Sequence, residues 1–460
     1  MAVQKVAVSG SLAQTGICVD QYSECPLAPH YGYCADELFR NKYCQKSCGQ
    51  CNANNFLEPT CTATLDVATS ERFTNDLHRF AFGLLRTARA SASSPSADNA
   101  KNVLVSPVSI ALAAGMLLAG SESTTRTQLR QAVAADVPSD QLNSAFSWLY
   151  TQLNGDKLSY TNKLYQLYTV NRVYVQQGLP VRAQFMAILN ECFHSSVQQS
   201  NFQLDADLVR QEINKWVQEQ TNTKITELLP PKSVTAMTRM ILVNALYFKA
   251  DWARPFRQTI EGAFYPLASP NNAKLVKMMV QEAQFDYYED LNSQVLRMPY
   301  KNNELHMLLL LPKQRTALPA LEQRLIDDPT KFARLHTLLS PHRVKLTIPK
   351  FKMEENFDLS RSLRALGVTD AFDRRLADFS RITPLTNAGD RLFLSDAFHK
   401  TFVEVNENGT EAAAATGFVV SLTSMPIRVK QFKVEHPFFF AITHRNSNNN
   451  ILFLGSVHDI

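Results

Sequence analysis

The pattern of hydrophobic and polar positions changes at about Val67. From there on, apolar residues recur at helical or strand spacing, whereas residues 1–66 show neither pattern. A helix is predicted over residues 71–88 by apolar positions three or four residues apart, at Phe73, Leu77, Phe80 and Leu84. A short strand followed by a buried helix of small residues is predicted by VLVSPVSIALAAGMLLAG, residues 103–120.

Strand patterns dominate the second half of the chain. They cover residues 169–175, 240–248, 294–298, 305–311, 343–348, 392–398, 429–434, 438–443 and 451–457. There is no internal repeat and no regular alternation of strand and helix. The pattern therefore predicts a mixed α+β domain.

Four segments are expected. Residues 1–17 are small and polar and are expected to be disordered, residues 18–51 form a cysteine-rich module, residues 52–66 are a linker, and residues 67–460 form the large domain. Within that domain, residues 90–101 (ARASASSPSADNAK in wider context) are expected to form a flexible loop.

The segment EVNENGTEAAAATGFVVSLTSMPIRV, residues 404–429, combines conflicting local preferences. Its four alanines favour helix, and Thr410 and Gly417 are suited to begin and end one. Such a helix would have under two turns and no amphipathic stripe to pack with. Local physics alone therefore predicts a surface loop.

Composition excludes several classes of protein. The 460 residues are 45% hydrophobic and 19% charged, and the net charge is +5, with Lys and Arg scattered rather than clustered, so no nucleic-acid partner is expected. No apolar run approaches the length of about 18 residues that a membrane span needs. Nucleotide-binding, hydrolase-elbow and zinc-protease motifs are absent, and we expect neither catalysis nor a cofactor nor a metal. His399, in an apolar strand context, is expected to be a hydrogen-bonded core histidine.

The cysteines point to an oxidising compartment. Six of the eight lie between Cys18 and Cys51, which indicates disulfides or a metal cluster. CGQC (48–51) could be a thioredoxin-type redox motif, but the surrounding strand pattern that such a motif requires is absent. A zinc site would need a second close cysteine pair or several histidines, and only His30 lies nearby. Disulfides and secretion are therefore expected, although the N-terminus shows no apolar signal-peptide core.

Several motifs in the large domain occur in the order typical of one family. They are NVLVSPVSIALAAGML (102–117), INKWVQEQTNTKITELL (213–229), LVNALYFKADWARPF (242–256), VKMM with QVLRMPY (276–300), FKVEHPFFFAI (432–442) and ILFLGSV (451–457). On these motifs the domain resembles the serpins from about Val67 to its end. The resemblance implies a monomer with three β-sheets, about nine helices and an exposed reactive-centre loop.

The resemblance gives the alanine-rich segment a role. It implies that the hinge of the loop comprises Glu407, Gly409, Thr410, Glu411, Ala412, Ala413, Ala414, Ala415 and Thr416. A protease cuts the loop, which then inserts as a new strand into the main sheet and carries the acyl-linked protease with it. Alternate side chains must enter the sheet interior, and the small residues Thr410, Ala412, Ala414 and Thr416 suit that demand.

The same resemblance places the scissile bond between Thr423 and Ser424, with Leu422 and Met425 as alternatives. The apolar or small surroundings favour a chymotrypsin-like or elastase-like target protease. Residues 128–146 contain no cluster of Lys and Arg, so heparin activation is not indicated.

Further positions match structural clusters of the family. Ser106, Ser109, Asn244 and His399 match its shutter, a polar cluster beneath the strands that must part, and Trp252 matches the breach, where insertion begins. Each of them is also compatible with plain core packing. Asn408 begins an N-x-T sequon. Because most sequons match by chance, we expect this site to be unoccupied; a glycan there would obstruct insertion and make the protein a poor inhibitor or a plain substrate.

The cysteine module resembles the ShK-type domain through CVD at residues 18–20 and CQKSCGQC at residues 44–51. That resemblance implies the disulfides Cys18–Cys51, Cys25–Cys44 and Cys34–Cys48. The module lacks the Lys-Tyr pair of channel blockers at its usual spacing and has a net charge of −1 (three basic and four acidic residues), which favours an accessory or localising role. The sequence leaves open whether Cys61 and Cys192 pair or stay free.

The sequence is compatible with three functions. The leading hypothesis is a secreted suicide inhibitor of serine proteases. A non-inhibitory serpin that acts as a carrier or chaperone is the second, and a channel- or receptor-binding protein that acts through residues 18–51 is the third. Non-inhibitory members usually carry bulky, charged or proline residues in the hinge, and the inward positions here carry none.

Overall fold

The computed structural model describes residues 61–92, 101–154, 165–384, 391–410 and 429–460, so the cysteine module and residues 411–428 lie outside it. The described residues contain nine α-helices: α1 (Val67–Ala92), α2 (Pro107–Gly120), α3 (Ser123–Val133), α4 (Leu142–Asn154), α5 (Ala183–Phe193), α6 (Phe202–Gln220), α7 (Leu318–Asp327), α8 (Thr330–Leu338) and α9 (Leu359–Ala365). Helix α2 begins as its sequence predicts, because Ser106 caps it and Pro107 occupies the first turn.

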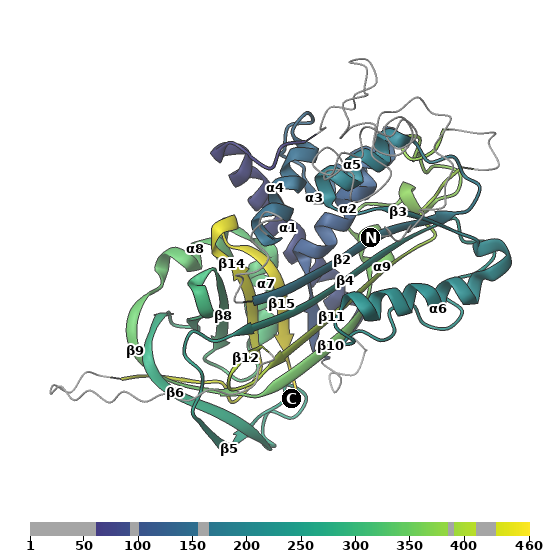
Figure 1. Ribbon diagram of the computed structural model, residues 1–460. Helices are drawn as coiled ribbons and strands as arrows, with labels where there is room; N and C mark the ends of the chain where they lie inside the picture. The colour runs from purple at the N-terminus through teal and green to yellow at the C-terminus, as the bar shows by residue number, and fades with distance from the viewer. Residues whose placement is uncertain (1–60, 93–100, 155–164, 385–390, 411–428) are drawn as a thin grey trace, which may run out of the picture.

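A six-stranded sheet crosses the molecule (Figure 1). Its order is β10 (Phe351–Asp358), β11 (Asp396–Val405), β12 (Gly409–Thr410), β4 (Met240–Asp251), β2 (Tyr165–Gln176) and β3 (Val197–Ser200). Strands β4 and β11 also pair directly and in parallel, from Asp396↔Ile241 to Phe402↔Tyr247. The short strand β12 therefore separates them only at one end.

The other strands form a nine-stranded sheet. Eight follow the order β1 (Val103–Val105), β15 (Asn450–Val457), β14 (Phe438–His444), β8 (Leu305–Pro312), β7 (Ser293–Pro299), β6 (Lys274–Glu289), β9 (Ser340–Pro349) and β13 (Lys430–Lys433), and β5 (Gln258–Phe264) pairs with β6. The first seven residues of β6 pair with β5 and its last four pair with β7. This long strand thus joins two of the three expected sheets into one hydrogen-bonded ladder.

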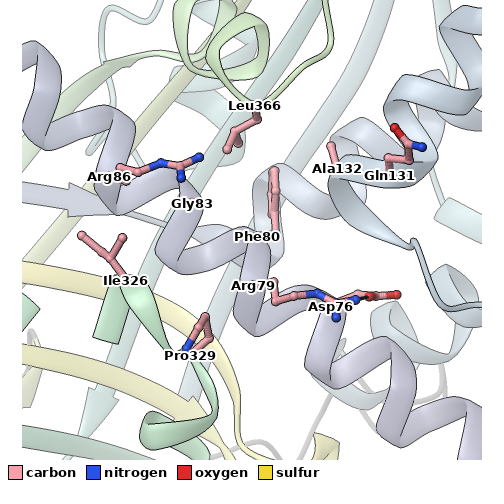
Figure 2. A pocket seen from close by; sticks show the side chains of 10 residues that line it. All are labelled: Asp76, Arg79, Phe80, Gly83, Arg86, Gln131, Ala132, Ile326, Pro329 and Leu366. Carbon is pink, nitrogen blue, oxygen red and sulfur yellow. Dashed lines mark hydrogen bonds and ion pairs between the residues drawn. The ribbon is translucent and has the colours of Figure 1, made fainter. Parts of the chain in front are cut away.

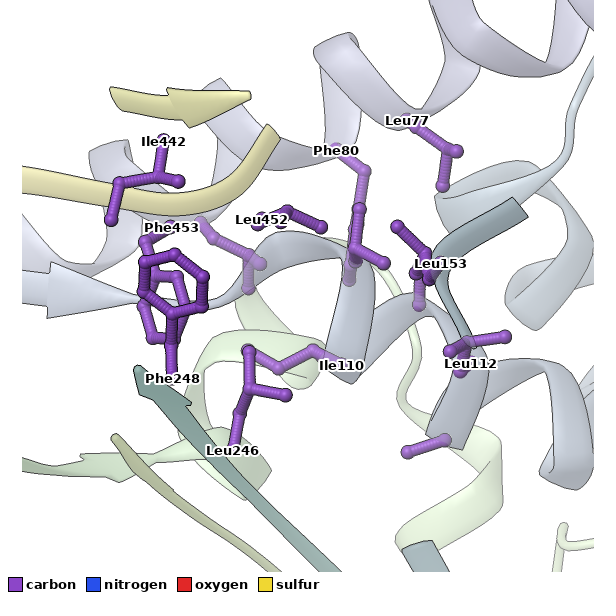
Figure 3. Close-up of a cluster of buried hydrophobic side chains, with 14 of the residues drawn as sticks. Leu77, Phe80, Ile110, Leu112, Leu153, Leu246, Phe248, Ile442, Leu452 and Phe453 are labelled. Atoms are coloured by element: carbon purple, nitrogen blue, oxygen red, sulfur yellow. The ribbon is translucent and has the colours of Figure 1, made fainter. Parts of the chain in front are cut away.

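The main core lies where α1 and α2 pack between strands of both sheets. Figure 3 shows side chains from the two helices meeting side chains from β4, β14 and β15. The labelled residues include Phe80, Ile110, Phe248 and Phe453, all of which are at most 2% exposed. Helix α2 has no exposed residue, which agrees with its uniformly small and apolar sequence.

The strand expected at residues 392–398 was placed too early. Strand β11 begins at Asp396, because the preceding backbone makes other hydrogen bonds: the N–H of Leu394 donates to Ala371 O and that of Ser395 donates to Met240 O. The strand patterns also missed β5, β6 and β10, which carry many polar residues on their exposed faces.

Cys61 and Cys192, whose state the sequence left open, form a disulfide with a Cα–Cα distance of 5.9 Å. It ties the segment before α1 to the last turn of α5. The N–H of Thr62 also donates to Ser144 Oγ of α4, at 3.0 Å. The segment that precedes α1, at the end of the linker from the cysteine module, is therefore anchored to α4 and α5 of the large domain.

Loss of this disulfide should destabilise the large domain. The bond spans 131 residues, and for a loop of that length the chain-entropy relation predicts that the Cys61→Ala/Cys192→Ala variant loses about 3–5 kcal/mol of unfolding free energy. Urea denaturation in non-reducing buffer measures this loss. Added reductant should leave the large-domain transition of the double variant unchanged, and equal large-domain midpoints for variant and wild type would contradict the prediction.

Candidate functional site

The predicted hinge begins inside the six-stranded sheet. Gly409 pairs with Asp251 and Thr410 with Ala250 of β4, while Thr410 also pairs with Val405 of β11. Beyond this point β4 and β11 pair with each other. The seam between the two strands is therefore open where the hinge enters and closed along the rest of its length (Figure 1).

Thr410 is neither a loop residue nor a helix cap, as local propensity suggested. Its side chain is 0% exposed, and its hydroxyl lies 2.9 Å from the hydroxyl of Tyr300. The backbone pairing offered by β4 and β11 outweighs the local helix preference of the alanines that follow. A polar side chain is accepted at this buried position because it has a hydrogen-bond partner.

Gly409 is required by close packing against β4. A Cβ atom at this position would lie 2.0 Å from the carbonyl oxygen of Ala250 and 2.6 Å from the Cα of Asp251. Both contacts are with backbone, which cannot rotate away. The sequence reasoning assigned Gly409 to backbone freedom at a bend, and the structure adds a second reason for glycine, the absence of a Cβ atom.

Trp252, the expected breach residue, lies against the hinge. Its ring stacks on Tyr300 with centroids 4.4 Å apart and planes 17° apart. The indole Nε1–H donates to Asn406 O at 3.0 Å, and the backbone N–H donates to Asn408 O at 2.8 Å. Burial raises the pKa of Tyr300 above its usual range, so its hydroxyl stays protonated beside Thr410. Trp252 thus holds the turn at residues 406–408, and Tyr300 holds Thr410, where this turn has led into β12.

Glu407 is fixed on the other side of this turn. Its carboxylate pairs with Lys350 and accepts a hydrogen bond from Thr259 Oγ1 at 2.7 Å. Its backbone carbonyl accepts from the N–H of Phe256 at 2.8 Å. Burial opposes ionisation, but the hydrogen bonds from Lys350 and Thr259 hold the pKa of Glu407 below its usual range. The start of the hinge is thus tied to β5 and to the chain between β9 and β10.

Reversing the charge of Glu407 should loosen this attachment. Glu407→Lys would place a second cation beside Lys350, and because both side chains are about one-third exposed we expect a loss of only about 1–2 kcal/mol of unfolding free energy. The swapped pair Lys350→Glu/Glu407→Lys should recover at least half of that loss in urea denaturation. No recovery in the swapped pair would show that the ion pair is not the cause.

The four expected shutter residues form one buried hydrogen-bond network. Asn244 of β4 and His399 of β11 face each other in register across the seam, and His399 Nδ1 binds Asn244 Oδ1. Asn244 Nδ2 donates to Ser109 Oγ at 2.7 Å and to Ser109 O at 3.0 Å. The N–H of Ser106 donates to His399 Nε2 at 3.2 Å. The prediction that His399 is a hydrogen-bonded core histidine is confirmed.

Asn171 of β2 is a fifth member that the sequence reasoning missed. It pairs in register with Asn244, and Asn244 Nδ2 also donates to its Oδ1. Strand β2 also contains Gln166, Thr169, Arg172 and Gln176, so its pattern did not single out Asn171. Since the Ser106 amide occupies Nε2 of His399, the ring proton is on Nδ1 and the ring is neutral. Burial lowers the pKa of His399 to about 3, which agrees with this arrangement.

Acid should therefore destabilise the folded protein. An unfolded histidine, with a pKa of about 6.5, takes up a proton as pH falls, whereas folded His399 does not until about pH 3. Stability is complete above pH 6.5 and declines below it, and His399 alone should account for a loss of about 2 kcal/mol at pH 5. Burial likewise lowers the pKa of the histidines His78, His306, His336, His436 and His458. Urea denaturation at pH 7.5, 6 and 5 tests the trend, which a constant unfolding free energy would contradict.

Other expected site residues lie outside the described residues. They are Glu411 to Thr416 of the hinge, Leu422, Thr423, Ser424 and Met425 around the scissile bond, and the six cysteines of the module. Asn408 is described, and it is only partly exposed in the turn before β12. In the part of the chain that the structure describes, no group of three or more acidic, histidine or cysteine side chains is placed to hold a metal, and no helix is long and apolar enough to cross a membrane.

A cleft of about 310 Å³ lies along α1 (Figure 2). Its lining includes Asp76 and Arg79, which pair with each other, while Arg79 also pairs with Asp136 at 2.7 Å. Phe80 and Leu366 supply apolar walls. None of these residues contributes to the hinge or to the polar network.

Comparisons with known proteins identify the family to which this fold belongs. Residues 75–460 match the family described as Serpin (serine protease inhibitor), and residues 17–51 match the ShK domain-like family. Leukocyte elastase inhibitor of Equus caballus is 37% identical over 365 residues, which cover 78% of this chain and 93% of that protein. This chain belongs to the serpin family. The predicted α+β serpin fold and the ShK-like module are confirmed.

Solved structures support the same assignment. Human thyroxine-binding globulin aligns with this serpin at a TM-score of 0.74 and 29% identity, covering 85% of this chain and 99% of that one. Serpin48 of Tenebrio molitor aligns at a TM-score of 0.71, also with 29% identity, over 85% of this chain and 98% of that one. The similarity therefore spans nearly the whole length of these serpins and leaves the N-terminal module as an addition.

Proposed function

We propose that this serpin is a secreted suicide-substrate inhibitor of serine proteases, with a reactive bond between Thr423 and Ser424. The observation that carries the proposal is the pairing of Gly409 and Thr410 between β4 and β11. An inhibitor of this type must feed its cleaved loop into the main sheet, and here the first hinge residues already lie between the two strands that have to part. The residues that follow, Glu411 to Thr416, carry small side chains at the inward positions.

The proposed reaction begins as ordinary proteolysis. The serine hydroxyl of the protease attacks the carbonyl carbon of Thr423, the peptide bond to Ser424 breaks, and the new amine of Ser424 takes up the proton that the serine hydroxyl gave up. An ester then joins Thr423 to the protease. Insertion of residues 411 onward between β4 and β11 would carry the ester away before water cleaves it.

The energy for insertion comes from new backbone pairing. Beyond Phe402 and Tyr247 the two strands of the seam are held apart by β12, and further pairs have to separate in turn as the loop advances. Each inserted residue would pair with both β4 and β11, whereas the ladder that it replaces joins these two strands only once. The direct bond between Asn244 and His399 is the polar contact that must break on the way.

Two features support secretion. The Cys61–Cys192 disulfide is of a kind that persists in oxidising compartments. The ShK-like match over residues 17–51 adds six cysteines, for which the family's pairing would give Cys18–Cys51, Cys25–Cys44 and Cys34–Cys48. The module would then localise the inhibitor, and the large domain would act as a monomer on its target.

The target is proposed to be chymotrypsin-like or elastase-like. Leu422, Thr423 and Met425 offer small or apolar side chains to the specificity pocket, and the first arginine downstream is Arg428. The relative named leukocyte elastase inhibitor agrees with this choice.

The test is a titration of chymotrypsin, pancreatic elastase and trypsin with the full-length protein. We expect progressive and irreversible loss of chymotrypsin or elastase activity at near-equimolar inhibitor, with little loss of trypsin activity. Full residual activity of all three proteases, together with intact inhibitor, would reject inhibition of these proteases. Full activity with a cleaved loop would indicate a non-inhibitory serpin.

A further inference from the structure

Arginines gather on the surface formed by the starts of α3 and α5, the end of α9, and the chain from η7 (Asp370–Phe372) to residue 391. Seven arginines of these segments are exposed or partly exposed, and the segments contain no lysine: Arg126, Arg182, Arg364, Arg374, Arg375, Arg381 and Arg391. With four carboxylates among them (Glu122, Asp370, Asp373 and Asp378), this arginine patch has a net charge of +3. Its members are up to 265 positions apart, so the sequence alone shows no cluster.

Printed contacts of the side chains join the patch into one surface. Arg182 Nε donates at 2.8 Å to the carbonyl oxygen of the residue before Arg381. Arg381 in turn pairs with Glu122 at the start of α3. Arg391 Nη1 donates to the carbonyl oxygen of Arg375 at 3.0 Å. The fold therefore brings α3, α5 and the chain after η7 together at this surface.

Several of these guanidinium groups contact backbone or aromatic groups. Arg126 Nη1 donates to Leu118 O at 2.7 Å, and the Arg364 guanidinium lies 4.3 Å from the centre of the Phe372 ring. Burial and the nearby charge of Arg381 lower the pKa of Arg126. A guanidinium has five N–H donors, so each of these groups retains donors for an acidic partner.

Most carboxylates of the patch accept hydrogen bonds from neutral donors. Asp378 accepts from Ser123 Oγ at 2.7 Å, and Asp370 accepts from Gln128 Nε2 at 2.9 Å. Asp373 accepts at 2.7 Å from the backbone N–H two residues further on. Positive charge thus exceeds negative charge at this surface, which suits it to a partner with several carboxylates.

The ShK-like module is tethered close to the patch. Cys61 is bonded to Cys192 in the last turn of α5, and Arg182 is the N-cap of the same helix, so the two ends lie about 15 Å apart. Nine residues, 52–60, join the last cysteine of the module to Cys61. A chain of that length spans at most about 30 Å, which is enough for the module to reach the patch.

The charge of the module is divided unevenly along its sequence. Residues 18–38 contain four carboxylates and neither Lys nor Arg, whereas residues 39–51 contain three basic residues and no carboxylate. Exposed ion pairs are individually weak, but a short tether gives an effective concentration on the order of millimolar. Weak pairs between residues 18–38 and the patch would therefore be enough to hold the module there.

We propose that the acidic part of the ShK-like module, residues 18–38, docks on the arginine patch of the same chain. The patch adjoins the start of β11, since the N–H of Leu394 donates to Ala371 O in η7. There β11 pairs with Ile241 of β4, whereas the hinge pairs with Ala250, about 30 Å further along the strand. Docking thus leaves the hinge end of the sheet free, and the inference does not depend on protease inhibition.

The test is carbodiimide cross-linking of the full-length protein at low concentration. The reagent joins carboxylates to lysine amines but not to arginine side chains, and the patch contains no lysine. Arg182→Lys and Arg375→Lys each introduce one amine and keep the positive charge. After digestion, mass spectrometry should find positions 182 and 375 linked to carboxylates of residues 18–38, in chains that migrate as monomers on a denaturing gel.

Arg72→Lys is the matched control. Arg72 is exposed on α1, only 11 positions after Cys61, so a module that is merely tethered would reach it as readily. We expect its cross-links to residues 18–38 to be at least about fivefold less abundant. Sodium chloride at about 1 M, which screens exposed charges, should lower the yield from positions 182 and 375 at least about threefold.

Four outcomes would overturn the docking. They are no cross-link from either patch position, equal yield from Arg72→Lys, a yield that salt does not change, and cross-links confined to dimers, which would indicate a second copy as the partner. All three substitutions change arginines of exposed residues to lysine, so folding is not threatened. Because no protease is present, the result stands whether or not the protein proves to be an inhibitor.

Discussion

Thr410→Arg should convert the inhibitor into a substrate that the target protease cleaves and releases. Thr410 is fully buried between β4 and β11, and an arginine there would have to enter the sheet interior without a carboxylate partner. A desolvation cost of about 3 kcal/mol would keep the hinge out of the seam in the uncleaved protein, so that the same cost falls on insertion after cleavage. Insertion would then be about a hundredfold slower, which allows water to cleave the acyl ester first. Titration against the target protease should show a large excess of inhibitor consumed per protease.

Thr410→Val is the matched control. Valine keeps the shape of threonine and removes only the hydroxyl that meets Tyr300. Tyr300→Phe removes the other half of the same contact. We expect both variants to inhibit at near-equimolar ratios, since small side chains still enter the sheet. Equal inhibition by Thr410→Arg and Thr410→Val would contradict the claim that the side chain at position 410 must enter the interior of the sheet.

Asn244→Ala should produce the largest loss of stability among single changes in the polar network. The amide contacts His399, Ser109 and Asn171. Without it, His399 and Ser109 would be left buried and Asn171 partly buried, each without this partner. Each unsatisfied buried group costs about 1–3 kcal/mol, so we expect a total loss of about 3–5 kcal/mol of unfolding free energy. The seam between β4 and β11 would also lose its direct side-chain bond, which should favour unwanted opening of the sheet.

Asn356→Ala is the control for this change. Asn356 lies in β10 of the same sheet, but its side chain is exposed. Its replacement should change the unfolding free energy by less than about 0.5 kcal/mol. Urea denaturation of the two variants at pH 7.5 makes the comparison, and similar midpoints would mean that Asn244 is not a central support of the sheet.

The sequence predicted the strands and helices whose periodicity is strong. Helix α1, the β1–α2 pair and the C-terminal strands β14 and β15 lie close to their expected ranges. The polar strands β5, β6 and β10 were missed, because their exposed faces dilute the apolar alternation. Local propensity was also wrong for Thr410, whose conformation depends on strands that lie up to 160 positions earlier in the chain.

The site was predictable only through family resemblance. The resemblance identified Ser106, Ser109, Asn244 and His399 as one cluster. The structure shows that hydrogen bonds connect these four residues. It did not indicate the contact between Tyr300 and Thr410, nor the close approach of Gly409 to Ala250. Such contacts depend on the relative placement of β4, β7 and β11, which periodicity along the chain does not encode.

The central claim, that a cleaved loop traps the protease as an ester, is tested most directly by intact mass spectrometry. The protein is mixed with chymotrypsin or elastase and quenched in acid. The account predicts a covalent species that contains the protease and residues 1–423, together with a released fragment that begins at Ser424 and ends at Ile460. Cleaved inhibitor beside free protease, with no covalent species for either enzyme, would contradict the account.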